Sequence, residues 1–99
     1  MSPRSLAEHE RKLIQAYSYC QLQMTPQQFL TKWGVTYEEI SLICDRAVST
    51  VSFWFSRQKN RRRPTRDDMR HLALVDFLLE NFDNIPVELR NLLCPFNLD

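Results

Sequence analysis

The chain has 99 residues, enough for one compact domain, and its 43% hydrophobic and 25% charged content is typical of a globular protein rather than a disordered one. A single glycine argues against a glycine-rich phosphate-binding loop and against the tight turns of a mostly β fold. No apolar run approaches the roughly 20 residues that cross a bilayer. No signal-peptide core follows Met1, so we expect a cytoplasmic protein without membrane contact.

The three cysteines, Cys20, Cys44 and Cys94, cannot all pair within one chain, and none has the spacing of a metal-binding cluster. We expect reduced thiols, with Cys44 buried as a small apolar side chain, and no metal ion or other cofactor. His9 and His71 have no serine or cysteine partner in a recognisable catalytic arrangement. The sequence therefore predicts a protein that is not an enzyme.

The net charge of +1 hides a strong segregation of charge along the chain. Residues 1–56 carry five basic and five acidic groups. Residues 57–70 carry seven basic groups and two aspartates, a net +5, whereas residues 71–99 carry one arginine and five carboxylates, a net −4. Such a chain can present a basic face to a polyanion and stay soluble. Double-stranded DNA is the expected partner, with a protein partner at the acidic C-terminal third as a further possibility.

Capping boxes mark the starts of three helices, because a hydroxyl and a side chain three residues later satisfy each other's free backbone N–H groups. The boxes run from Ser5 to Glu8, from Thr25 to Gln28 and from Thr36 to Glu39. The first opens an N-terminal helical extension within residues 1–24. The second opens a short helix that should stop at Gly34, where a left-handed conformation costs little. The third opens a helix that ends near Asp45.

A turn around Arg46 and Ala47 leads to a helix over residues 48–57. Its apolar side chains recur at the spacing of a single buried face. They are Val48, Val51, Trp54 and Phe55. Phe53 is left on the opposite face, where we expect it to pack under the N-terminal helix, with a DNA contact as the alternative.

The C-terminal part is also helical by its pattern. Residues 58–64 are polar and basic, which predicts a loop, and a longer helix follows over residues 66–82. Asp67 and Asp68 lie in its first turn, where the helix dipole favours negative charge. A last short helix starts near Pro86 and ends near Cys94. The sequence therefore predicts one all-α domain, a compact bundle of about five to six helices. Its parts are residues 1–24, 25–57, 58–64 and 65–99.

Small and apolar residues within residues 36–57 have a specific spacing. Ile40 precedes the small Ser41, the turn position Asp45 follows four residues later, and Val51 and Trp54 come six and nine residues after that. This pattern resembles the helix-turn-helix of bacterial transcription regulators. In that family the small residue lets two helices cross closely, and the outward face of the second helix enters the major groove of DNA.

Two positions depart from that resemblance. Asp45 stands where the family usually has glycine, and Ala47 stands where serine or threonine usually caps the second helix. Trp54 and Phe55, followed by arginines, also resemble the third helix of a homeodomain, but Arg57 replaces that family's adenine-reading asparagine. The second resemblance therefore implies a similar three-helix core and not the same base preference.

The resemblance places DNA contacts on the second helix and the segment after it. Arg57 is suited to a guanine, which a guanidinium can bind at two points. Expected base contacts are Ser49, Thr50, Ser52, Phe53 and Arg57. Expected phosphate contacts are Thr36, Tyr37, Lys59, Arg61, Arg62, Arg63 and Arg66. A merely solvated loop is the alternative for the basic segment.

The sequence as a whole predicts a sequence-specific DNA-binding protein, a transcriptional regulator that inserts its helix over residues 48–57 into the major groove. It should act as a homodimer, because one helix reads few base pairs, with residues 66–82 or the N-terminal helix as the interface. One alternative is a protein-interaction adaptor or accessory subunit that keeps the fold. Another is the DNA-recognition part of a mobile-element machinery.

Overall fold

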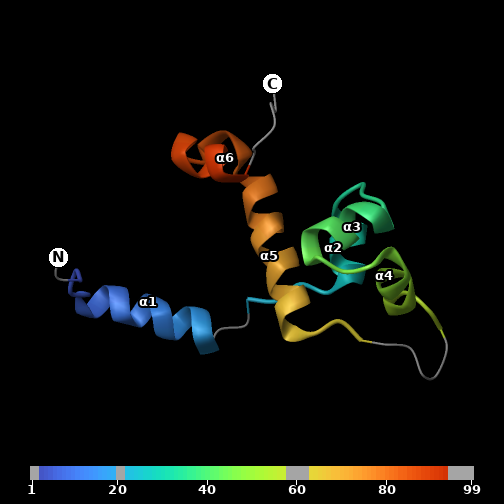
Figure 1. Ribbon diagram of the computed structural model, residues 1–99, viewed down its shortest axis with the longest axis horizontal. Helices are drawn as coiled ribbons and strands as arrows, with labels where there is room; N and C mark the ends of the chain where they lie inside the picture. The colour runs from blue at the N-terminus through green and yellow to red at the C-terminus, as the bar shows by residue number, and fades with distance from the viewer. Residues whose placement is uncertain (1–2, 20–21, 58–62, 94–99) are drawn as a thin grey trace.

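The computed structural model describes residues 3–19, 22–57 and 63–93, and within them the chain forms six α-helices, one 3₁₀ helix and no strand (Figure 1). In chain order these are α1 (Glu8–Tyr19), α2 (Pro26–Lys32), α3 (Tyr37–Cys44), α4 (Val48–Trp54), α5 (Arg66–Glu80), the 3₁₀ helix η1 (Phe82–Asn84) and α6 (Val87–Leu93). The prediction of an all-α fold with five to six helices is confirmed. None of the described helices is long and apolar enough to span a membrane.

The hydrophobic core lies where α2, α3, α4 and α5 meet. α3 packs against both α4 and α5, and α2 packs against α5. All four helices contribute buried apolar side chains, and Trp54 is the largest of these. They are Phe29, Ile40, Cys44, Val51, Trp54 and Leu72. Because Val51 and Trp54 lock the inward face of α4 into this core, the opposite face of that helix is turned outward.

α1 and α6 extend away from the four central helices (Figure 1), and both expose apolar side chains such as Leu13 and Leu92. α1 begins at Glu8, so the predicted capping box at Ser5 is wrong. The Glu10 carboxylate instead accepts a hydrogen bond from the Ala7 N–H at 2.7 Å, which moves the helix start along the chain. The predicted helix end near Cys94, and the predicted reduced thiols of Cys20 and Cys94, lie outside the described residues.

The predicted capping boxes at Thr25 and Thr36 are present, with both reciprocal hydrogen bonds in each. Gly34, however, does not have a positive φ, so the predicted left-handed helix stop is wrong. The chain leaves α2 through Trp33 in an extended conformation, with φ −118° and ψ 139°. An extended exit requires no left-handed residue.

Three residues join α3 to α4. Asp45 has φ 54° and ψ 51°, and it is the only non-glycine residue with a positive φ in the described part of the chain. No side chain caps α4 at Ala47, as its sequence predicts. α4 ends at Trp54 rather than at residue 57, because the next two N–H groups bond to carbonyls three residues back and tighten the chain into a turn.

The buried face of α4 is shorter than predicted. Val48 is 40% exposed, so the prediction that it is buried is wrong. Val51 and Trp54 belong to the buried core cluster, whereas Val48, at the first position of the helix, does not. Phe55 is half-buried and packs against the edge of the core. α5 is also shorter than predicted: it ends at Glu80 and not at residue 82.

Candidate nucleic-acid interface

The outward face of α4 consists of short polar side chains and one aromatic ring. Ser49 and Ser52 are exposed, and Thr50 is half-buried at the boundary with the core. Phe53 is 46% exposed in spite of its large apolar side chain. The helix has no charged residue of its own, so charge at this surface comes from the segments that flank it.

Phe53 does not pack under the N-terminal helix, and that prediction is wrong. α1 lies on the opposite side of α5 from α4 (Figure 1). Tyr17 and Ser18, in its last turn, contact Arg70 and Arg66 of α5. The ring of Phe53 therefore faces solvent beside the two serines.

Exposed arginines stand at both ends of the segment that joins α4 to α5. Arg57 lies three residues beyond the end of α4, and Arg63 lies two residues before the N-cap of α5. Lys59, Arg61 and Arg62, for which we predict phosphate contacts, lie outside the described residues. Every charged residue from 57 to 63 is basic.

Arg66 faces α1 and not α4. Its Nη2 donates a hydrogen bond to the Ser18 carbonyl at 2.7 Å, and Arg70, one turn later, lies over the Tyr17 ring at 4.5 Å. The last carbonyls of a helix lack partners within it and carry the negative end of its dipole. Arg66 therefore stabilises the end of α1, and its predicted phosphate contact would compete with this role.

The first residues of α3 are engaged by neighbouring side chains. The Thr36 hydroxyl accepts a hydrogen bond from the Glu39 N–H at 3.2 Å and donates to its carboxylate, also at 3.2 Å. The Tyr37 ring stacks on Phe55, with centroids 4.6 Å apart and an interplanar angle of 8°. Glu38 and Glu39 add negative charge at this helix end. Thr36 and Tyr37 thus lie in an acidic setting, and Tyr37 braces the chain just after α4.

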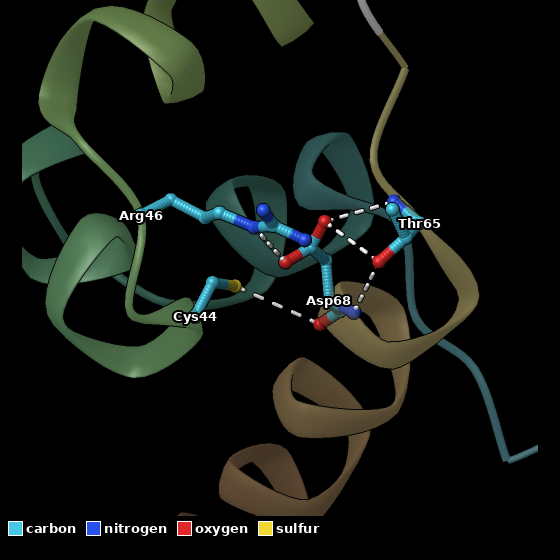
Figure 2. A network of polar contacts seen from close by, with 4 residues as sticks. All are labelled: Cys44, Arg46, Thr65 and Asp68. Carbon is cyan, nitrogen blue, oxygen red and sulfur yellow. Dashed lines mark hydrogen bonds and ion pairs between the residues drawn. The ribbon is translucent and has the colours of Figure 1, made fainter.

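An ion pair ties the α3–α4 connection to the start of α5, as Figure 2 shows. Arg46 Nε donates to Asp68 Oδ1 at 2.9 Å, and the N–H and hydroxyl of Thr65 donate to Asp68 Oδ2 at 2.8 and 3.0 Å. The Asp68 side chain is 3% exposed and that of Arg46 is 41% exposed. We call Arg46, Thr65 and Asp68 the turn clamp. It fixes the position of α4 relative to the point where the basic segment enters α5.

The surroundings of Asp68 and Cys44, in and beside the turn clamp, shift the pKa values of both side chains. Burial favours the protonated form of Asp68, but hydrogen bonds from Arg46 and Thr65 outweigh it and lower the pKa of Asp68 below 3.8. Burial, and then the charge of Asp68, raise the pKa of Cys44 to about 12. The Cys44 thiol donates to the Asp68 carbonyl at 3.6 Å and is buried, as predicted. It is protonated at neutral pH and is not an activated nucleophile.

Sequence reasoning missed the turn clamp. It assigned Asp68 only to the helix dipole, although Thr65 and Asp68 have capping-box spacing with aspartate at the third position. That spacing could have predicted the hydrogen bonds between Thr65 and Asp68 at the start of α5. Nothing local points to Arg46, because its partner lies 22 residues further along the chain.

Part of the acidic C-terminal third is neutralised within the molecule. Lys32 Nζ lies 2.7 Å from Asp76 Oδ1 and 2.7 Å from Glu80 Oε1. Trp33 Nε1 donates to Asp76 at 3.0 Å. These contacts join α2 to α5, and they leave less negative charge for a protein partner than the sequence alone suggests.

Across residues 3–19, 22–57 and 63–93, no group of three His, Cys, Asp or Glu side chains is placed to hold a metal ion. No protein-family model, curated protein or solved structure matches the chain. Its function is therefore inferred from the arrangement of its own residues.

Proposed function

We propose that this protein is a transcriptional regulator that binds double-stranded DNA by placing α4 in the major groove. The observation that carries the proposal is the outward face of α4, which is uncharged and exposed on a helix whose other face is locked in the core. The major groove is about 12 Å wide and admits such a helix. Five basic and no acidic residues follow from 57 to 63, where they can reach phosphates beside the groove.

The proposed contacts divide into two kinds. Arg57 binds a guanine edge at two points, and the hydroxyls of Ser49, Thr50 and Ser52 bind base edges or phosphates. The other basic residues neutralise phosphates and release counterions, which adds affinity without sequence information. These are Lys59, Arg61, Arg62 and Arg63. Thr36, Tyr37 and Arg66 are left out because of their contacts within the chain.

The test of the proposal is selection of bound sequences from random duplex DNA, followed by titration at several salt concentrations. We expect one enriched motif, and a fall in log K with log salt whose slope is roughly −0.9 for each phosphate contacted. Absence of binding to any duplex at low salt would reject DNA binding. Equal binding to all duplexes would reject sequence specificity.

Two arginine variants separate the kinds of contact. Arg57→Ala should reduce discrimination at one guanine by about tenfold. Arg63→Ala should weaken binding to all sequences alike and reduce the salt slope by about one phosphate. Arg4→Ala removes the same charge at an exposed position before α1 and serves as the matched control. If Arg4→Ala weakens binding to all sequences as much as Arg63→Ala does, net charge and not the site drives binding.

We propose that the active form is a homodimer joined through α1. The apolar side chains of this helix are exposed, with Leu13 at 70%, and Ile14 and Tyr17 lie next to it on the surface. A two-fold pair would place two copies of α4 on one duplex and double the length of the site. Sedimentation velocity of the free protein measures the oligomeric state.

A protein-interaction adaptor is the second candidate. The observation that favours it is an open apolar groove of about 730 Å³ between α2 and α5, lined by Met24, Ala73 and Phe77 among others. This role requires no contact between α4 and DNA. The low-salt duplex titration distinguishes the two, since an adaptor gives no binding there.

A further inference from the structure

Phe53 is an unusual residue for a surface that contacts DNA. It is the largest exposed side chain on α4, and its neighbours on the outward face, Ser49 and Ser52, are among the smallest. When the helix enters a groove, the serines allow a close approach and the ring projects beyond them. Polar groups that an apolar ring covers lose their hydrogen bonds to water without gaining a partner.

The major groove offers one strongly apolar group, the C5 methyl of thymine. The other base edges there present hydrogen-bond donors and acceptors, and the phosphates are charged. A phenylalanine can contact that methyl through its ring without a hydrogen bond. Insertion of an aromatic wedge between base steps is instead a feature of minor-groove binders, whereas a helix like α4 fits the major groove.

We propose that Phe53 contacts a thymine methyl and thereby selects thymine at one position of the bound DNA sequence. This inference rests on the proposed placement of α4 in the major groove. It assigns to Phe53 a specificity that depends on shape and apolar contact, while Arg57 selects guanine through hydrogen bonds. Arg57 lies three residues beyond the end of α4, so Phe53 and Arg57 belong to the same proposed DNA-binding surface.

The experiment replaces each thymine of the selected duplex, one at a time, with deoxyuridine. This change removes only the methyl group and keeps every Watson–Crick hydrogen bond. Burial of one methyl corresponds to about a fourfold change in affinity. We expect one position per bound α4 at which uridine weakens binding of the unaltered protein by about fourfold. At the other positions, the affinities for the thymine and uridine duplexes should be nearly equal.

Combining the Phe53→Ala variant with the uridine duplexes gives a double-mutant cycle between the ring and the methyl group. The variant should bind the thymine and uridine duplexes equally at the sensitive position, since its side chain no longer reaches the methyl. Phe53→Leu should keep part of the discrimination. Phe82→Ala is the matched control, because Phe82 is also half exposed, at 45%, but lies beyond α5. It should keep the full difference between the two duplexes. Circular dichroism of each variant confirms that it is folded.

Each outcome decides a different claim. Sequence-selective binding with no uridine-sensitive position overturns the role of Phe53 and leaves DNA binding intact. A uridine penalty that persists in Phe53→Ala assigns the methyl contact to another residue and also overturns the inference. Failure to bind any duplex overturns both the inference and the proposed function. A binding protein whose uridine penalty vanishes in Phe53→Ala, and persists in Phe82→Ala, supports both.

Discussion

Asp45 occupies a left-handed conformation that β-branched residues rarely adopt. The short polar side chain of aspartate tolerates it, and glycine has no Cβ to clash there. We expect Asp45→Gly to change the free energy of unfolding by no more than about 0.5 kcal/mol, and Asp45→Val to lower it by about 1–2 kcal/mol. Both variants remove the same charge, so chemical denaturation of the pair isolates the backbone effect. Equal stability of the two variants would contradict this interpretation.

The turn clamp has an asymmetry that two substitutions expose. Arg46→Met leaves the buried Asp68 carboxylate without its cationic partner, whereas Asp68→Asn leaves a guanidinium that can reach water. We expect Asp68→Asn to cost about 1–2 kcal/mol through the weakened cap and lost ion pair. At pH 7, Arg46→Met should lower the free energy of unfolding, and with it Tm, by more than Asp68→Asn does. A smaller loss for Arg46→Met than for Asp68→Asn would contradict a buried, charged Asp68.

Acid should weaken the turn clamp. Because the folded-state pKa of Asp68 is lowered, its contribution to stability is complete above its ordinary value of 3.8 and is lost as the pH falls through the folded-state value. The free energy of unfolding should therefore decrease once the pH drops under about 4. Asp68→Asn, which does not titrate there, should show a shallower fall. Urea denaturation at a series of pH values measures both curves, and parallel curves would contradict the assignment.

α4 is a seven-residue helix without a side-chain cap at its start. The backbone at Ala47, with φ −67° and ψ 148°, already has the extended conformation of an N-cap. Ala47→Ser should therefore supply a hydroxyl for a free backbone N–H and stabilise the protein by about 0.5–1 kcal/mol. Ala47→Val has no acceptor and serves as the control. Thermal unfolding followed by circular dichroism compares the two, and an unchanged Tm in Ala47→Ser would count against the cap.

The sequence predicts elements best where their determinants are local. Thr25 and Thr36 mark helix starts within four residues, so both boxes could be predicted, as could the burial of Val51 and Trp54. The end of α4 could not, because it depends on which carbonyls the next N–H groups reach. The exposure of Phe53 depends on where α1 lies, and α1 is positioned by arginines some 50 residues away in the chain.

At the scale of the whole molecule, two arginines of α5 hold the last turn of α1: Arg66 bonds to the Ser18 carbonyl and Arg70 lies over the Tyr17 ring. The Leu13 side chain of α1 is 70% exposed. Leu13→Glu should therefore leave the unfolding free energy of a monomer nearly unchanged and should dissociate a dimer formed through α1. Sedimentation velocity of wild type and variant, with Lys12→Glu as an exposed control on the same helix, measures this. A dimer that survives Leu13→Glu places the interface elsewhere.

The turn clamp also joins residues 46 and 68 into a closed ring of chain. α4 lies within that ring, and the basic residues follow it in the sequence. The ion pair therefore limits how far α4 can move from the start of α5. If α4 binds DNA as proposed, the duplex meets a helix that is already held in place, and little loop entropy is lost on binding.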